Sequence, residues 1–423
     1  MTSFAQLVAR QLRADLAALP ERRRRWSPAE RVARCGNVAE LRDLARRSVP
    51  GPVFDFVDGA AGDEVTARRN REDFDRITLV PKVLTDVSEI DLRTTVLGHP
   101  VASPLLGAPT GLTGLVHHEG ELGIARGVHA AGSVYVASTV ASYSIEELAA
   151  RAPGPTWFQL YVWRDRGLVR DLLERARAAG HLALVVTADV PRAGARERDV
   201  RNGFSVPPRI TLRSLGAGAM RPRWSADFIR RPRMTFGNVA GRAGAPSDAM
   251  LLSGLINSQF DPTLSWDDLA WIRETWTGPL VVKGLLHPDD ARQAVGIGVD
   301  GIIVSNHGGR QLDHAVSSIA ALPAIVDAVE DAAEVYLDGG IRRGVDVVKA
   351  LAAGARACLA GRALVYGVGA GGGAGAARAM QILVEELRLA LTLLGCPSAR
   401  DLDASFLRAH GSGRLGAAAP SPD

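Results

Sequence analysis

Short apolar runs alternate with helical segments along the chain from about residue 100 onward. Runs rich in Val, Ile and Leu are typical of strands buried in a parallel sheet, and helical segments between them are typical of repeated βα units. We predict strands at residues 101–108, 134–137, 157–161, 182–187, 280–283, 301–305, 335–337 and 357–360. Eight βα units close on themselves, so the predicted fold class is α/β, a (β/α)8 TIM barrel.

Helices are expected between these strands, and several of them end at a glycine, as a helix C-cap does. The clearest helical segments are residues 168–179, 289–295, 324–332 and 345–353. With 423 residues, 47% of them hydrophobic, the chain has enough material for one large catalytic domain plus tails. We expect an N-terminal helical extension over 1–36, the barrel over 37–400 and a C-terminal tail over 401–423.

A long insertion of about residues 203–262 is expected after the fourth strand, because more than sixty residues separate Asn202 from Trp266. Loops of this length are usually lids or disordered segments. Aromatic residues alternate with arginines between Arg221 and Phe236, which also suits an anionic lipid surface. Both interpretations stay open, and nucleic-acid binding is disfavoured because the chain offers no groove-reading module or stacking platform.

The cysteines and the N-terminus bear on localisation. Cys35, Cys358 and Cys396 stand far apart, outside any CxxC or Cys/His spacing, so we expect neither disulfides nor a metal site, and a cytoplasmic protein. No run of eighteen apolar residues exists, so a membrane span is not expected. Apolar residues from Phe4 to Leu19 recur near helical spacing, which fits an amphipathic helix lying on a membrane or, more simply, a surface helix or frayed tail.

Polar residues and glycines follow every predicted strand. The carboxyl ends of barrel strands meet at one rim, where the active sites of such barrels lie. One strand-end Thr or Asp is usually a cap or a turn residue, but all eight strands together indicate a cofactor site. The strand-end residues are Pro109-Thr110-Gly111, Ser138-Thr139, Gln159 with Tyr161, Thr187 with Asp189, Lys283, Ser305-Asn306-His307, Asp338-Gly339-Gly340 and Gly361-Arg362.

The segment SNHGGRQLD, residues 305–313, carries the most specific chemistry. The imidazole of His307 can accept a proton near neutral pH, and the guanidinium of Arg310, three residues later, can bind a planar carboxylate in bidentate fashion. A lone loop histidine is usually structural. This dense context instead suits a substrate with an acidic group and an oxidisable C–H bond.

Several segments together resemble the FMN-dependent 2-hydroxy acid dehydrogenase and oxidase family, which includes lactate and mandelate dehydrogenases and glycolate oxidase. The likeness runs from about Val38 to Cys396. Its motifs are APTG (108–111), FQLYV (158–162), TADVPRAGARERDVRNGF (187–204), LVVKG (280–284), SNHGGRQLD and LDGGIRRG (337–344).

The resemblance implies a role for each residue of the predicted site. His307 would be the base, with Asp189 stabilising its protonated form. Arg310 and Arg196 would bind the substrate carboxylate and Tyr161 its hydroxyl, while Lys283 would stabilise charge on the reduced flavin. The implied flavin contacts are Pro109, Thr110, Gly111, Ser138, Gln159, Thr187 and Ser305. Asp338 would reach the ribityl chain, and the phosphate would lie on Gly339, Gly340, Arg342, Gly361 and Arg362.

The implied reaction is oxidation of an L-2-hydroxy acid to the 2-oxo acid, by hydride transfer or through a carbanion. L-lactate is the expected substrate, and mandelate or a bulkier acid is the alternative. Phe56 stands where the family usually has a tyrosine that contacts the substrate, and Val140 stands where glycolate oxidase has a large aromatic residue. Gly111 and the insertion resemble the membrane-associated dehydrogenases, which implies a quinone or other respiratory acceptor, peripheral contact with the inner face of the cell membrane, and a homotetramer.

Two other interpretations stay open. A flavin- or phosphate-binding barrel that catalyses isomerisation would not need paired arginines around a base, so Arg196 and Arg310 argue against it. A noncatalytic FMN-binding barrel, with Phe56 as a sign of decay, would be yellow but would not be reduced by any 2-hydroxy acid.

Overall fold

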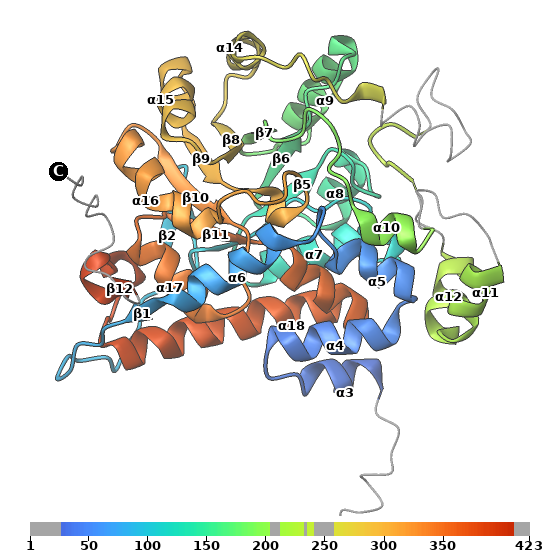
Figure 1. The fold of residues 1–423 in the computed structure, drawn as a ribbon, viewed down its shortest axis with the longest axis horizontal. Helices are drawn as coiled ribbons and strands as arrows, with labels where there is room; N and C mark the ends of the chain where they lie inside the picture. Colours follow the sequence, from blue (N-terminus) through green and yellow to red (C-terminus); the bar gives the residue numbers. More distant parts are fainter. Residues whose placement is uncertain (1–26, 204–211, 232–234, 241–257, 410–423) are drawn as a thin grey trace, which may run out of the picture.

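The structure is a computed structural model that describes residues 27–203, 212–231, 235–240 and 258–409 (Figure 1). Eight parallel strands form a closed barrel in the order β10-β11-β4-β5-β6-β7-β8-β9, which confirms the predicted TIM barrel. The barrel strands are β4 (Leu105–Gly107), β5 (Tyr135–Ser138), β6 (Thr156–Leu160), β7 (Leu184–Thr187), β8 (Leu280–Leu285), β9 (Gly301–Val304), β10 (Glu334–Asp338) and β11 (Ala357–Ala360).

Side chains fill the inside of the barrel. Trp157 and Tyr336 meet edge to face with ring centroids 5.5 Å apart, and aliphatic residues from the other strands pack around them. An antiparallel hairpin, β2 (Thr94–Val96) and β3 (His99–Val101), adds Val96 and Val101 to this cluster. A packed interior of this kind leaves the ends of the barrel as the places for a ligand.

Two sequence predictions need correction. The predicted first strand, 101–108, is two elements, because the chain leaves β3 after Val101 and starts β4 only at Leu105. Pro104 has no N–H to continue a strand ladder. The predicted helix 324–332 is α16 (Ser318–Val329), which begins earlier, where the Ser317 side chain caps it by accepting from the N–H of Ala320, and contains Pro323.

Helices surround the barrel (Figure 1). The long α18 (Arg362–Leu394) packs against α3 (Pro28–Ala33), α4 (Val38–Ser48), α7 (Gly120–Ala130) and α17 (Gly344–Ala352). The remaining helices are α5 (Gly51–Asp58), α6 (Val65–Arg76), η1 (Thr113–Leu115), α8 (Ile145–Arg151), α9 (Arg166–Ala178), α10 (Glu197–Arg201), α14 (Trp266–Thr275), α15 (Pro288–Ile297), η2 (His307–Gly309), η3 (Ala399–Asp401) and η4 (Ala404–Phe406).

The C-terminal end of the described chain pairs with a strand that precedes the barrel. β12 (Leu407–Ala409), in the segment that the sequence analysis assigns to the C-terminal tail, lies antiparallel to β1 (Ile77–Leu79). The apolar pattern from Phe4 to Leu19 lies outside the described residues. Among the residues that the structure does describe, no helix is long and apolar enough to cross a membrane.

Two helices of the insertion are described, α11 (Leu212–Ala219) and α12 (Pro222–Arg230), and they lie at one side of the molecule (Figure 1). The indole N–H of Trp224 donates to the carbonyl of Leu115 at 3.1 Å, and the guanidinium of Arg221 donates to the carbonyl of Val49 at 3.3 Å. These bonds attach α12 to the loops that follow η1 and α4.

Candidate active site

A cavity of about 520 Å³ opens at the carboxyl ends of the barrel strands. Of the residues predicted for the site, all line it except Asp189 and Ser305, which contact His307 and Lys283. The predicted residues that line the cavity are Pro109, Thr110, Gly111, Ser138, Gln159, Tyr161, Thr187, Arg196, Lys283, His307, Arg310, Asp338, Gly339, Gly340, Arg342, Gly361 and Arg362.

His307 and Asp189 form a hydrogen-bonded pair between the loops after β9 and β7. Nδ1 of His307 lies 3.1 Å and 3.3 Å from the two carboxylate oxygens of Asp189. Burial by itself raises the pKa of the Asp189 carboxyl, but the nearby charges of His307 and Lys283 outweigh burial, and the net pKa is lowered. An ionised Asp189 holds the proton of His307 on Nδ1 and leaves Nε2 free to accept another.

The backbone of the His307 loop is held in an unfavourable conformation. His307 has φ 58°, in the left-handed region that residues other than glycine rarely adopt. Helix α6 supports this turn, because the side chains of Asn70 and Asn306 donate to each other at 2.8 Å and 2.7 Å. A Cβ at Gly309 would lie 2.7 Å from the backbone N of Ala67, so α6 fits closely only against glycine. The sequence analysis did not identify Asn70 and marked Asn306 only as a strand-end residue, since neither amide carries reactive chemistry.

Three guanidinium groups meet around the cavity. Arg310 donates to the carbonyls of Phe56 and Gly59 at 2.9 Å and 2.8 Å, and Arg362 donates to those of Val57, Gly308 and Gly59. Burial lowers the pKa of Arg310, and repulsion from Arg196 and Arg362 lowers it further. Crowded cations that donate to neutral carbonyls provide a site for anions.

Lys283 has a fixed counter-ion. Its ammonium lies 3.2 Å from Oδ2 of Asp338 and donates to the hydroxyl of Ser305 at 2.9 Å. Burial lowers the pKa of this lysine, but Asp338 and Asp189 more than compensate, and the net pKa is raised. The lysine therefore stays charged although its side chain is almost fully buried.

A chain of polar side chains crosses the floor of the cavity. The hydroxyl of Ser138 donates to Oε1 of Gln159 at 3.1 Å, and Nε2 of Gln159 donates to the hydroxyl of Thr187 at 2.9 Å. Two buried oxygens at the same cavity, Oγ1 of Thr110 and Oδ1 of Asp338, have no hydrogen-bond partner within the described part of the chain. Buried oxygens of this kind call for a ligand, because burying them unpaired is costly.

Glycines and basic residues line the cavity where β10 and β11 end. Gly339 and Gly340 have φ 94° and 91°, and a Cβ at Gly340 would lie 2.1 Å from the carbonyl oxygen of Asn70. Asp346 accepts from the N–H of Arg342 at 2.8 Å and so orients this turn. Loops after the seventh and eighth barrel strands are the usual phosphate site of this fold.

Aromatic rings form part of the remaining cavity wall. The ring of Phe56, from α5, lies against the guanidinium groups of Arg310 and Arg196, 5.4 Å and 5.7 Å from its centroid. Phe260 meets Tyr161 edge to face, with ring centroids 5.4 Å apart. Phe236 and Phe260 were not predicted for the site, because they lie in the insertion and no motif marks them.

A phosphorylated, planar, redox-active group meets the requirements of these residues. The two unpaired oxygens belong to residues that line the cavity, the glycine turns and arginines suit a phosphate, and Lys283 suits a ring that becomes negative on reduction. The fold and the site thus define a flavin-dependent barrel oxidoreductase.

The family follows from comparison with known proteins. The model of the FMN-dependent dehydrogenase family matches residues 45–409, and the chain belongs to this family. Its cofactor is therefore FMN, and it is an FMN-dependent 2-hydroxy acid dehydrogenase.

Curated relatives and solved structures support this assignment. The chain is 44% identical to the L-lactate dehydrogenase of Xanthomonas euvesicatoria pv. vesicatoria (strain 85-10) over 371 residues, covering 87% of this chain and 95% of the relative. It is 45% identical to that of Caulobacter vibrioides (strain NA1000 / CB15N), covering 88% and 97%. The crystal structure of the monotopic membrane protein (S)-mandelate dehydrogenase matches with a TM-score of 0.86 and 38% identity, covering 89% of this chain and 100% of that one.

Replacing Asp189 by Asn tests its charge. Because its pKa is lowered in the folded chain, the ionised carboxylate stabilises the fold above the ordinary carboxyl pKa, and this contribution is lost as the pH falls through the lowered value. The urea midpoint of Asp189→Asn should lie below that of the parent near pH 7, and the difference should shrink as the pH falls through and below the ordinary carboxyl range.

The exposed Asp43 on α4 provides the control for this experiment. Asp43→Asn should show no such pH-dependent difference from the parent. A difference in urea midpoint between Asp189→Asn and the parent that stays constant over the whole pH range would contradict the lowered pKa of Asp189.

Proposed function

We propose that the enzyme oxidises L-lactate to pyruvate. The observation that carries this proposal is an imidazole held by a carboxylate beside half-buried arginines in a flavin-sized cavity. Identity of 44–45% to proteins named L-lactate dehydrogenase supports lactate as the substrate. A larger acid such as mandelate is the second candidate, because Val140 leaves room in the cavity and the solved neighbours include mandelate enzymes.

In this proposal His307 is the base. Its Nδ1 is engaged by Asp189, so Nε2 accepts the proton that leaves the substrate. The carboxylate of Asp189 then stabilises the imidazolium, since opposite charges at about 3 Å attract strongly where water is excluded. A positioned base of this kind contributes roughly 10²- to 10⁴-fold to a rate.

Arg310 and Arg196 bind the substrate carboxylate. Arg310 is held rigid by its two backbone carbonyl acceptors, so little entropy is lost when the anion binds. The hydroxyl of Tyr161 donates to the substrate oxygen. Burial raises the pKa of Tyr161, with Asp189 adding to the shift, and this phenol stays protonated as a donor.

The cofactor-side residues hold the FMN and balance its charge. When bound, FMN supplies a two-electron acceptor beside the substrate's Cα. Pro109, Thr110, Gly111, Ser138, Gln159, Thr187 and Ser305 line or support the place of the ring. Lys283 provides a fixed positive charge next to it, Asp338 accepts from the ribityl hydroxyls, and the phosphate binds at Gly339, Gly340, Arg342, Gly361 and Arg362.

Anaerobic mixing with single substrates tests this function. The oxidised flavin absorbance of the purified holoenzyme should disappear on addition of L-lactate, more slowly or not at all with glycolate. His307→Gln should keep its FMN spectrum but be reduced about 10²- to 10⁴-fold more slowly. Faster bleaching by L-mandelate than by L-lactate would shift the assignment to the second candidate, and no bleaching by any 2-hydroxy acid would leave a noncatalytic FMN-binding barrel.

The variant Phe56→Tyr tests the effect of having a phenylalanine where the family usually has a tyrosine that contacts the substrate. A hydroxyl at this ring, between Arg196 and Arg310, adds a hydrogen bond to an anion, worth about 1.5 kcal/mol. The KM for L-lactate should therefore fall about 10-fold, with kcat little changed. Phe56→Leu, which adds no hydroxyl, should not lower KM. An equal fall of KM in both variants would mean that the new hydrogen bond is not responsible.

The electron acceptor and the membrane are further parts of the proposal. We infer that electrons pass to a quinone or another respiratory acceptor while the insertion contacts the inner face of the cell membrane. Ile229 and Met220, at α12, are 77% and 70% exposed next to Arg223 and Arg230. An apolar and basic surface of this kind suits anionic lipid. The resemblance also supports a homotetramer, which light scattering would measure.

Vesicle binding tests this surface. The protein should sediment with vesicles containing phosphatidylglycerol, less so at high salt, and Ile229→Asp should reduce binding more than Leu389→Asp, a change at a comparably exposed leucine on α18. Detergent-free fractionation that leaves all of the protein in solution, with fast turnover on oxygen alone, would contradict both the membrane and the quinone.

A further inference from the structure

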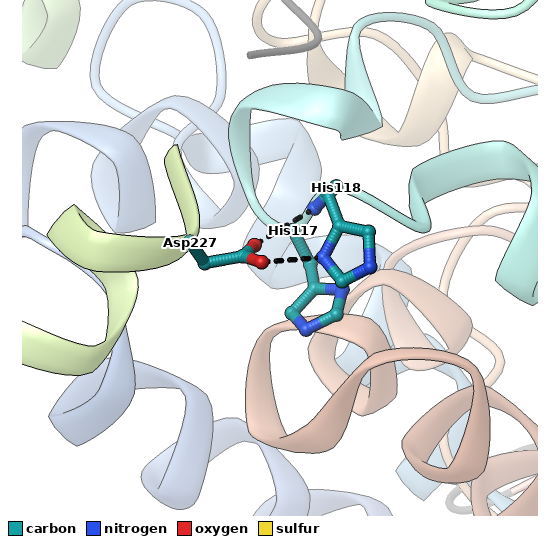
Figure 2. Close-up of side chains that lie close together, drawn as sticks. All are labelled: His117, His118 and Asp227. Carbon is teal, nitrogen blue, oxygen red and sulfur yellow. Dashed lines mark hydrogen bonds and ion pairs between the residues drawn. The ribbon is translucent and has the colours of Figure 1, made fainter. Parts of the chain in front are cut away.

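Two imidazoles and a carboxylate lie together away from the barrel strands. His117 and His118 come from the loop between η1 and α7, and Asp227 comes from α12 of the insertion (Figure 2). One nitrogen or oxygen of each lies within 4.8 Å of the others, and all three residues are half-buried. Side chains of these types at this spacing are typical metal ligands.

The tight turn before α7 brings the two histidines to one side. The N–H of Gly120, which has φ 35°, donates to the carbonyl of His117 at 2.9 Å. Adjacent side chains on a strand would point to opposite faces, but in this turn the two rings lie 4.5 Å apart between centroids at 33°. The two rings therefore lie side by side, and that of His118 contacts Asp227 of α12 (Figure 2).

Asp227 is brought to the histidines by the anchoring of α12. Trp224 donates to the carbonyl of Leu115, and Asp227 lies three residues later on the same helix face. Oδ1 of Asp227 is 2.7 Å from Nδ1 of His118, and Oδ2 accepts from the His118 N–H at 3.3 Å. The Nδ1 atom is nevertheless buried without an aligned hydrogen bond. A cation bound between the two atoms would satisfy both of them in place of this contact.

We propose that His117, His118 and Asp227 bind a divalent transition-metal ion of the Zn²⁺ type, which clips α12 to the barrel. Two imidazoles and one carboxylate suit such ions, and water can complete a four-coordinate shell at the half-exposed side. The site lies next to Val116, which lines the active-site cavity, so the ion fixes one border of that cavity. This departs from the sequence analysis, which expected no metal.

Neighbouring groups support the imidazoles. Glu119 lies 3.8 Å from Nδ1 of His117, and its carboxylate accepts from the N–H of Gly373 at 2.8 Å. Nδ1 of His117 also accepts from the backbone N–H of Glu119 at 3.2 Å, so Nε2 is the atom of this ring that a metal would use. These contacts fix the orientation of the ring.

One group opposes the metal. Nη1 of Arg231 donates to Nε2 of His118 at 2.9 Å, which places the proton of this ring on Nδ1, toward Asp227. A metal on Nδ1 requires the proton to move to Nε2, so Arg231 must withdraw. Arg231 is exposed at the end of α12 and can do so. This arginine therefore weakens metal binding.

Titration of the FMN-loaded protein with ZnCl₂, after removal of metals with EDTA, tests the site. Calorimetry should show one ion per chain. Asp227→Asn and His117→Gln should each weaken binding more than about 10-fold, while keeping the flavin spectrum of a folded protein. The matched control is His287→Gln, because His287 lies 3.7 Å from Asp289 on an exposed helix start. It should leave this binding unchanged.

Arg231→Gln separates a metal site from a bridge made by the protein alone. For a metal site, removing the competing cation tightens Zn²⁺ binding, and added Zn²⁺ slows hydrogen–deuterium exchange in peptides that cover residues 222–230. If Asp227, His118 and Arg231 only bridge each other, the variant loosens α12 and Zn²⁺ changes nothing. Absence of binding up to about 1 mM Zn²⁺, or equal binding by parent and Asp227→Asn, would overturn the proposal.

Discussion

Positive charge concentrated at one end of a packed barrel is the constraint on which the site depends. Arg310 and Arg362 are half-buried, and their described hydrogen bonds go to backbone carbonyls, so their charge is oriented but not neutralised. Burial lowers the pKa values of both. Repulsion from Arg196 and Arg362 adds to the shift of Arg310, and repulsion from Arg342 adds to that of Arg362. Lys283, in contrast, has Asp338 as a permanent counter-ion. The positive charge of Lys283 is thus balanced by a carboxylate of the protein, whereas the positive charge of the arginines attracts bound anions.

Holding the base in place has a structural cost that helices outside the sheet offset. The left-handed backbone at His307 is strained, and the paired amides of Asn70 and Asn306 fix it. A Cβ at Gly309 or Gly340 would collide with α6 at Ala67 or Asn70. Gly309 of SNHGGRQLD and Gly340 of LDGGIRRG therefore allow α6 to pack closely, and Gly340 also lines the ligand cavity. Helix α6 contacts both the loop of the base and the turn at the phosphate end of the cavity.

Elements outside the barrel supply what distinguishes this site. Phe56 comes from α5, and its ring lies against the two arginines that face the substrate. Phe236 and Phe260 come from described parts of the insertion, and both line the cavity. The strands fix the chemistry common to the family, while these peripheral segments set the shape and polarity of the substrate's surroundings.

The sequence by itself determined the barrel and most of the residues at its mouth. Buried parallel strands are continuous apolar runs, and the rule that their carboxyl ends share one rim brings Thr110, Lys283 and Arg362 into one cavity without coordinates. Sequence did not place the break at Pro104 or the start of α16, since local patterns leave element boundaries open.

Only the tertiary structure decided which distant residues meet. Asn70 and Asn306 are 236 positions apart, and Asp227 reaches His118 from 109 positions away. Neither pair has a motif, because an amide or a carboxylate acquires its role from the partner that folding brings within hydrogen-bonding distance. The charge, the polarity and the spacing of apolar residues can be read from the sequence. The pairing of side chains from different elements is fixed only when the barrel closes and its helices pack.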